Sequence, residues 1–232
     1  QVVKLDDLQA GVVGGLFAGL IYLFPFFTGA LADRMGFLSA LVLAFALLSA
    51  GYGGLGLAST LAADTGRLPG VGLLPVVLLA LLLIVLGGSF VKPIISGTVA
   101  LSSDAVNRAR AFSIFYMVVN IGSFTGKTIV APIRIQLGVG TVPYFSAAMA
   151  ALALVLVLLL YRPKSELSTR PRSVAETLQG MAAALSNGRF LALILITAGF
   201  WAIQGQLYAS MPDYVLRMVG SEAKPEWLAN VN

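Results

Sequence analysis

Long apolar runs separated by short polar loops dominate this chain. Six of the runs approach or exceed the roughly 20 residues that a helix needs to cross the hydrocarbon core of a membrane. Within each run, apolar residues occupy successive positions and do not show the strict alternation of a half-buried strand. The pattern predicts an all-α, multi-pass integral membrane protein with runs at approximately 9–30, 37–60, 72–97, 111–135, 141–161 and 190–212.

Composition supports a membrane protein and removes several kinds of chemistry. Hydrophobic residues make up 58% of the chain and charged residues 11%, whereas soluble domains are roughly one-quarter charged. Neither Cys nor His occurs, which excludes disulfides, thiol chemistry and the usual transition-metal ligand sets. No nucleophile elbow and no pair of carboxylates lies in a run. We therefore expect neither an enzyme nor a bound cofactor.

The positions of the basic residues predict the orientation in the membrane. A net charge of +5 would suit a nucleic-acid partner in a soluble protein, but in a membrane protein the distribution of Lys and Arg among the loops matters more. With the loop after the first run in the cytoplasm, eight basic residues lie inside and five lie outside, the inner set being Arg34, Arg108, Arg110, Arg162, Lys164, Arg170, Arg172 and Arg189. We expect a bacterial inner-membrane protein with the lipid bilayer, and no nucleic acid, as a partner.

Residues 162–189 form the clearest linker. Helix breakers gather in its first half, at Pro163, Ser165, Thr169 and Pro171. A capping-box pair, Ser173 and Glu176, then opens an amphipathic segment whose apolar residues share one face, at Val174, Leu178, Met181 and Leu185. Asn187 and Gly188 predict its end. The segment is either a helix on the inner membrane surface or a solvated spacer.

The linker divides the chain into three parts. Residues 1–161 form a bundle, residues 162–189 a cytoplasmic linker with an amphipathic helix, and residues 190–232 the first helix of a second bundle with the start of its following loop. Gln1 is not an initiator Met, and the chain stops at Asn232 where a further helix is expected. We expect a piece of a longer protein with material missing at both ends.

A polar stripe follows the fourth run. Its members lie at i, i+4, i+7 and i+11, which is one face of an α-helix: Tyr116, Asn120, Ser123 and Lys127. Such a stripe either lines a cavity or makes interhelical hydrogen bonds while Lys127 extends toward the membrane surface. Because Lys127 lies about two turns inside the run, we favour a substrate cavity.

A second lysine, Lys92, lies in the third run. Ser89 and Ser96 share its helical face, and the adjacent Pro93 favours a bend. No Asp or Glu lies deep in any run, so Lys92 and Lys127 need a counter-charge from another segment or from a substrate anion, unless they are neutral. Alternatively, Lys92 pairs with backbone carbonyls at the bend. An anionic substrate group is therefore one expectation.

Two further faces carry polar or aromatic residues. The first run presents Tyr22, Phe26, Gly29 and Asp33 on one face, either as helix packing or as a binding wall. Asp33 stands beside Arg34 at a helix end, where a carboxylate caps a helix or pairs with a base, so we expect a gating role. The last run presents Trp201, Gln204 and Tyr208, either toward a cavity or as interfacial anchors.

The loop after the first run resembles the Gly, Asp-Arg, Gly motif of the major facilitator superfamily of secondary transporters. The matching residues, to which the resemblance gives a gating role, are Gly29, Asp33, Arg34 and Gly36. The resemblance implies a helical bundle in which the visible runs are helices two to seven of twelve or more, the first helix being absent. It also makes residues 162–189 the central cytoplasmic linker. Phe37 and Leu38 stand where a basic pair often follows in the family.

Within the superfamily, the chain is similar to proton-coupled oligopeptide transporters. Two motifs carry this likeness, one with Gly87, Gly88, Val91, Lys92 and Pro93, and the other with Phe115, Tyr116, Asn120, Gly122 and Ser123. The family pattern implies that three residues contact substrate: Tyr22, Lys92 and Asn120. It implies alternating-access transport of a peptide-like or other carboxylate-bearing small molecule, coupled to protons.

The chain also departs from that family. Gly205 stands where the family's seventh helix usually has a Glu tied to gating and proton coupling. The acidic first-helix motif and the tenth-helix acid fall outside the chain, so proton coupling rests on the resemblance alone. Lys127 is an addition that, with Lys92, favours an anionic solute. We expect substrate contacts from Tyr22, Lys92, Tyr116, Asn120, Lys127, Trp201 and Gln204; the alternative function is a non-transporting helical subunit of a larger complex.

Overall fold

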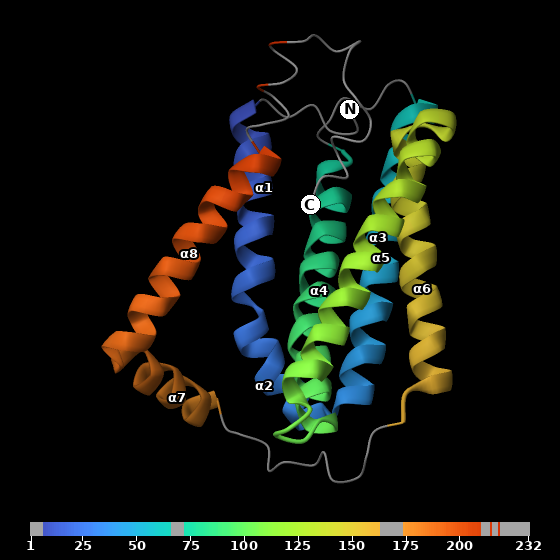
Figure 1. Cartoon of the computed structure of the whole chain (residues 1–232). Helices are drawn as coiled ribbons and strands as arrows, with labels where there is room; N and C mark the ends of the chain where they lie inside the picture. Colours follow the sequence, from blue (N-terminus) through green and yellow to red (C-terminus); the bar gives the residue numbers. More distant parts are fainter. Residues whose placement is uncertain (1–6, 66–71, 163–173, 210–213, 215–217, 219–232) are drawn as a thin grey trace. The chain divides into compact units, whose positions relative to one another are not determined.

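The computed structural model describes residues 7–65, 72–162, 174–209, 214 and 218, and divides into two compact units, Gln1–Arg172 and Ser173–Asn232. The helices of the first unit are α1 (Asp7–Leu23), α2 (Pro25–Met35), α3 (Phe37–Thr65), α4 (Leu74–Ser102), α5 (Arg108–Leu137), the short 3-10 helix η1 (Val139–Thr141) and α6 (Val142–Leu160) (Figure 1). Those of the second unit are α7 (Val174–Ser186) and α8 (Gly188–Ala209). The four expected helix breakers of the linker and Ser173 lie outside the described residues.

Five helices are long and apolar enough to cross a membrane, and a sixth span results if α1 and α2 count as one. This confirms the all-α, multi-pass membrane architecture expected from the runs. The apolar runs also located most of the helices, although α3 and α4 continue beyond the expected ends, to Thr65 and Ser102.

The first run is not the single helix expected over residues 9–30. α1 and α2 meet at Phe24 with a bend of 43°. Pro25 is the first residue of α2, and its ring nitrogen has no hydrogen to donate to the preceding turn. Hydropathy does not register this missing hydrogen bond, because the apolar run continues through the proline into Phe26 and Phe27.

Glycines bring α3 and α4 unusually close. A Cβ atom on Gly87 would lie 2.7 Å from the Ala44 carbonyl oxygen and 3.0 Å from the Leu48 nitrogen. Reciprocally, a Cβ atom on Gly51 would lie 2.9 Å from the Ala80 carbonyl oxygen. Each helix therefore places a glycine against the backbone of the other, a small-residue contact typical of membrane helices.

α6 packs on the opposite side of α3 through polar and aromatic contacts. The Ser49 hydroxyl donates to the Ala147 carbonyl over 3.0 Å, and the Tyr144 ring lies over Gly56, where a Cβ atom would approach it within 2.8 Å. The Tyr144 and Thr60 hydroxyls are 3.2 Å apart. These bonds satisfy polar groups inside a helix pair, where lipid offers no hydrogen-bond partner.

The best-packed part of the first unit joins α2, α3 and α4. Its core consists of Ala32, Ala40, Leu41, Ala44, Phe90 and Ile94, all at most 4% exposed. Tyr161, after the end of α6, packs against this cluster, and its hydroxyl lies 3.2 Å from the Thr98 hydroxyl. The core holds the end of α2 and the second half of α4 together.

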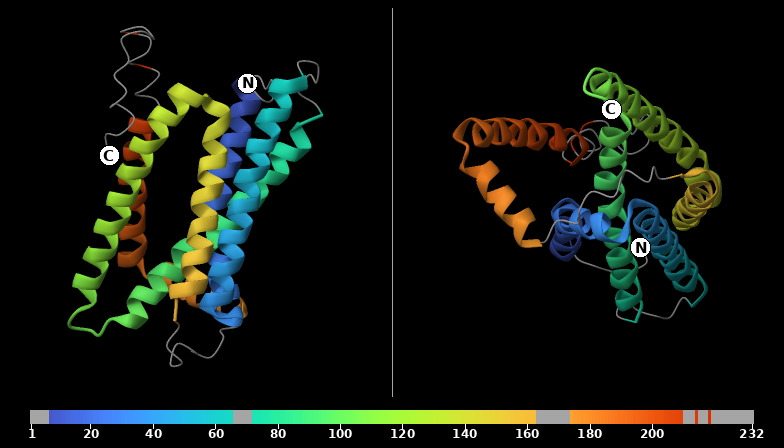
Figure 2. Two further views of the ribbon diagram at one scale, coloured as in Figure 1. Left: turned by 90° about the vertical axis from the view of Figure 1, so that its right-hand side faces the viewer. Right: turned by 90° about the horizontal axis from the view of Figure 1, so that it is seen from below.

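α5 is loosely packed, since none of its residues is buried. Figure 2 shows it diverging from α4 beyond the loop that they share. In that loop, the Asp104 carboxylate accepts hydrogen bonds from the backbone N–H of Asn107 over 2.8 Å and from its side-chain amide over 3.2 Å. These bonds lower the pKa of Asp104 because they favour the charged carboxylate, and nearby Arg108 adds to the effect.

In the second unit, α7 ends at Ser186 as Asn187 and Gly188 predict. Asn187 has a further role, since its side-chain oxygen accepts hydrogen bonds from the backbone N–H groups of Arg189 and Phe190 over 3.1 and 3.3 Å. It therefore caps the N-terminus of α8. The sequence-based boundaries of the linker at 162–189 stay a prediction.

Candidate functional site

Lys92 of α4 and Tyr22 of α1 come together in the first unit. The Lys92 ammonium nitrogen lies 5.7 Å from the centre of the Tyr22 ring, within the range of a cation–π contact. Both side chains are exposed, Tyr22 at 71%. α1 approaches α4 closely here, because a Cβ atom on Gly88 would lie 3.3 Å from Ile21 Cδ1. The two helices therefore present a cation and an aromatic ring on an accessible surface.

α2 is tied to α4 just beyond this pair. The Thr28 hydroxyl is 2.9 Å from the Ser89 carbonyl oxygen and 3.2 Å from that of Phe24. The next residue, Gly29, packs against Pro93, one turn beyond Ser89 on α4, and a Cβ atom on Gly29 would lie 3.6 Å from the proline Cβ. α4 therefore contacts both halves of the bent helix: α2 through Thr28 and Gly29, and α1 through the pair of Lys92 and Tyr22.

Ser89 does not share an exposed polar face with Lys92, contrary to the interpretation from spacing. It is fully buried, and its hydroxyl donates to the Leu86 carbonyl over 2.7 Å. Lys92 is the third residue after it, and at that spacing the close approach of α2 covers Ser89 and leaves Lys92 accessible. Ser96 is half-buried.

The exposure of the polar stripe of α5 decreases along the helix. Tyr116 is 56% exposed and its ring contacts that of Phe115, with centroids 5.1 Å apart. Asn120 is exposed, whereas Ser123 and Lys127 are half-buried and each has a polar interaction. Within the described residues, Asn120 does not hydrogen-bond Lys92. The substrate roles of Tyr116, Asn120 and Lys127 stay predictions.

An adjacent face of α5 borders a cavity of about 650 Å³ against α3 and α6. Gly122 and Gly126 line it, and a Cβ atom on either would meet nothing within 4 Å. The hydroxyl-bearing residues on its walls are Tyr52, Thr125 and Ser146. The stripe residues themselves do not line this cavity, so spacing alone located the polar face but not the open space.

The expected gate residues lie at the end of α2. Gly36 has φ +82°, a conformation that favours glycine, and its N–H donates to the Ala32 carbonyl to end the helix. Asp33 and Arg34 are both exposed on the last turn. Gly29 and Gly36 therefore have clear packing and turn roles, whereas the gating role of the Asp33–Arg34 pair stays a prediction.

Trp201 and Gln204 lie on α8 in the second unit. Trp201 is 63% exposed and meets Phe200 edge to face, with ring centroids 5.7 Å apart; Gln204 is half-buried. Gly205 is exposed in the same turn. The contribution of this helix to a site shared with Lys92 stays a prediction.

Sequence reasoning missed Thr28, which joins the two helices nearest the lysine. The signal was present, since a hydroxyl residue in the middle of an apolar run commonly hydrogen-bonds a neighbouring helix. Its partner, the backbone carbonyl of Ser89, could not be predicted, because every residue has a carbonyl and this one lies 61 residues away in the sequence.

Comparison with known proteins identifies the family of the chain. The family model of the Major Facilitator Superfamily matches residues 2–226. The chain is similar to the crystal structure of a mutant of the peptide transporter POT in complex with sulfate, with a TM-score of 0.59 and 25% sequence identity over 84% of this chain and 38% of that chain. For the POT mutant in complex with alafosfalin, the TM-score is 0.57 and the identity 24%, over 96% of this chain and 45% of that chain. No curated protein matches the chain.

The chain thus spans less than half the length of either transporter structure. The expected resemblance to the POT transporters is confirmed. Since the family model covers nearly the whole sequence, the chain belongs to the Major Facilitator Superfamily.

Proposed function

We propose that this protein is part of a secondary transporter that moves a small solute across the membrane by alternating access. The observation that carries the proposal is the Lys92 ammonium group held over the Tyr22 ring, 5.7 Å from its centre, on two helices of a membrane bundle. Ionisable groups at membrane depth are costly and usually serve a substrate or ion pathway. The solute we propose is peptide-like or otherwise carries a carboxylate.

The chemistry of the pair favours an anionic group on the solute. α4 contains no Asp or Glu, and the only acidic residue of α1 is Asp7, at its first position. The Tyr22 ring offers Lys92 a weak partner, because a cation–π contact at an exposed site is worth about 0.5–1 kcal/mol. A carboxylate would supply the full counter-charge, and an ammonium group binds it as a compact point charge.

Anion recognition by the similar structures supports the same solute class. One POT structure is a complex with sulfate and the other a complex with alafosfalin. We carry this over to the present chain as part of the proposal, together with proton coupling and a location in the bacterial inner membrane. Asp33 and Arg34, exposed on the last turn of α2, serve in the proposal as the inner gate.

Uptake by the full-length protein in proteoliposomes tests the proposal. Labelled dipeptides, organic anions and sugars are offered with and without an inward proton gradient. We expect uptake of a carboxylate-bearing solute, loss of that uptake in Lys92→Gln, and retention in Arg189→Gln, which removes an exposed cation elsewhere. Circular dichroism and gel filtration establish that each variant is folded. Normal uptake by folded Lys92→Gln contradicts the assignment.

A further inference from the structure

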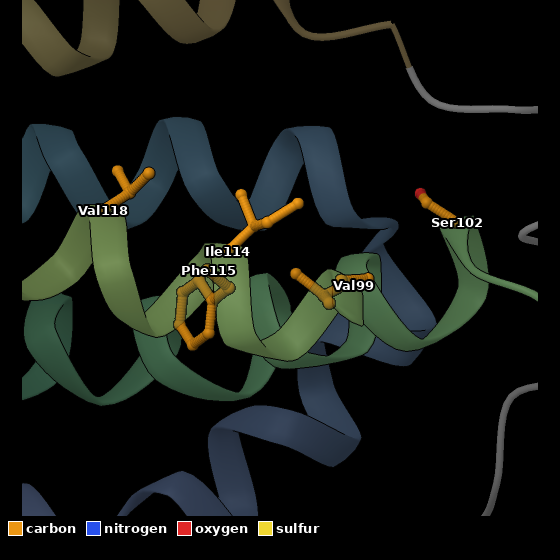
Figure 3. Close-up of a pocket in the computed structure, with 6 residues that line it drawn as sticks. Val99, Ser102, Ile114, Phe115 and Val118 are labelled. Atoms are coloured by element: carbon orange, nitrogen blue, oxygen red, sulfur yellow. The ribbon is translucent and has the colours of Figure 1, made fainter. Parts of the chain in front are cut away.

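A second accessible feature lies between the end of α4 and the start of α5. It is an open groove of about 430 Å³ whose walls are almost entirely apolar, formed by Val99, Ser102, Ala111, Ile114, Phe115 and Val118. Figure 3 shows Ile114 and Val118 projecting from successive turns of α5, with Ser102 toward the loop that joins the helices. The groove is separate from the Tyr22–Lys92 pair, which lies on α1 and α4.

Two arginines stand at the loop end of the α5 wall. Arg108 precedes Ala111 and Phe115 by three and seven residues, so it starts one row of groove residues on the helix face. Arg110 precedes Ile114 and Val118 by four and eight residues and starts the neighbouring row in the same way. Both arginines are exposed. Since helical side chains lean toward the N-terminus, both cations extend toward the loop.

The acidic group nearby offsets only part of this charge. Asp104 is the only acidic residue between α4 and the second arginine, and its carboxylate already accepts two hydrogen bonds from Asn107. The loop and the first turn of α5 thus carry one carboxylate against two guanidinium groups. An apolar groove with a net positive mouth is complementary to a molecule with an anionic head and an apolar tail.

The dimensions favour a single acyl chain. From Ala111 to Val118 the wall rises by roughly 10 Å along α5, a small part of a hydrocarbon core about 30 Å thick. A helix packed along α5 would need a longer contact surface than this groove provides. One acyl chain lies along such a slot while its headgroup stays at the level of the loop.

We propose that this groove binds one acyl chain of an anionic phospholipid, with the lipid phosphate bound by Arg108 and Arg110. Juxtamembrane basic residues attract anionic lipids, and basic pockets between membrane helices bind their headgroups. The predicted orientation, with both arginines inside, places this lipid in the inner leaflet. The inference goes beyond the proposed transport function and does not depend on it.

Native mass spectrometry of the full-length protein in neutral detergent tests the headgroup. Phosphatidylglycerol is compared with phosphatidylcholine of identical acyl chains. A contribution of about 1 kcal/mol per arginine corresponds to about a fivefold preference for each, or roughly 30-fold for both. We expect Arg108→Gln/Arg110→Gln to abolish the preference and Arg189→Gln to retain it. Equal binding of the two lipids by the wild type, or an unchanged preference in the double variant, overturns the proposal.

A second pair of variants tests the groove itself. Val118→Trp fills the slot, whereas Val119→Trp adds the same bulk at a neighbouring exposed position that does not line it. We expect only Val118→Trp to reduce phosphatidylglycerol binding. A photocrosslinking residue placed at Ile114 should then yield lipid adducts. Crosslinks to another segment of the protein instead of lipid would show that a helix covers the groove and would overturn the lipid assignment.

Discussion

Replacing Gly51 by Ala should separate α3 from α4 and destabilise the first unit. The new methyl group would lie 2.7 Å from Ile84 Cγ1, 2.9 Å from the Ala80 carbonyl oxygen and 3.0 Å from the Ile84 nitrogen. Two of these three atoms belong to the backbone of α4, so a change of side-chain rotamer cannot relieve the contact. The helices must move apart instead.

The magnitude follows from a comparison within the same helix. Gly53 also lies in α3, but a Cβ atom there meets nothing within 4 Å. Alanine is favoured over glycine in a helix by roughly 0.5–1 kcal/mol, and this gain is common to both variants. Overpacking costs about 1–3 kcal/mol, and only Gly51→Ala incurs it. The free energies of unfolding of the two variants should therefore differ by about 1–3 kcal/mol.

Unfolding in mixed micelles with increasing SDS, followed by far-ultraviolet circular dichroism, measures this difference. We expect the Gly53→Ala transition at or above the wild-type midpoint and the Gly51→Ala transition below it. Gly87→Ala should behave like Gly51→Ala, since its methyl group would lie 2.7 Å from the Ala44 carbonyl oxygen. If Gly51→Ala unfolds with Gly53→Ala, the close backbone contact is not a feature of the folded protein in its membrane-like environment.

Three further changes test the site and the termini of the helices. Tyr22→Leu should lower the KM for uptake of an anionic solute about two- to fivefold, because the solute carboxylate no longer has to displace the cation–π partner of Lys92, whereas Tyr22→Phe should leave the KM unchanged; equal effects would exclude a role for the ring. Asn187→Ala should destabilise the start of α8 by about 1 kcal/mol, measured as faster hydrogen exchange at the two capped amides, and Asn187→Asp should restore protection. Because the pKa of Asp104 is lowered in the folded protein, its charge stabilises the fold above the ordinary Asp pKa of about 3.9 and this contribution is lost as the pH falls through the folded value. Asp104→Asn should therefore be less stable than the wild type at neutral pH but not in strong acid, and a pH-independent difference would contradict this account.

The apolar runs predicted the helices well because lipid demands the same property from every span. Each helix needs a long stretch that satisfies its own backbone and exposes apolar side chains. The bend at Pro25 was not predicted from the apolar run. A proline inside an apolar run is compatible with either a kink or an uninterrupted helix, and packing around it decides between them. Here Thr28 and Gly29 fasten α2 to α4, so the chain bends where that fastening ends.

The site was partly predictable for a related reason. Lys92 drew attention because a cation in an apolar run needs an explanation, and that argument requires no partner. Its contact with Tyr22 joins residues 70 positions apart and depends on the close approach of Gly88 to Ile21. Periodicity reports which residues share a face of one helix. It gives no information on which face a second helix covers, and this is why Ser89 proved buried and Lys92 accessible.

The position of Lys92 relative to the bend bears directly on the proposed mechanism. Thr28 and Gly29 hold α2 against α4 at Ser89 and Pro93, on either side of the lysine in sequence. Tyr22 lies before Pro25, on the half of the bent helix that those contacts do not fasten. A movement of α1 about Phe24 would therefore separate the ring from the ammonium group while the lysine kept its place on α4. In an alternating-access cycle, this would couple the position of α1 to the counter-charge of Lys92, because a bound carboxylate replaces the ring as the partner of the cation. The division of the helix at this proline would let the lysine remain fixed while its aromatic partner moves.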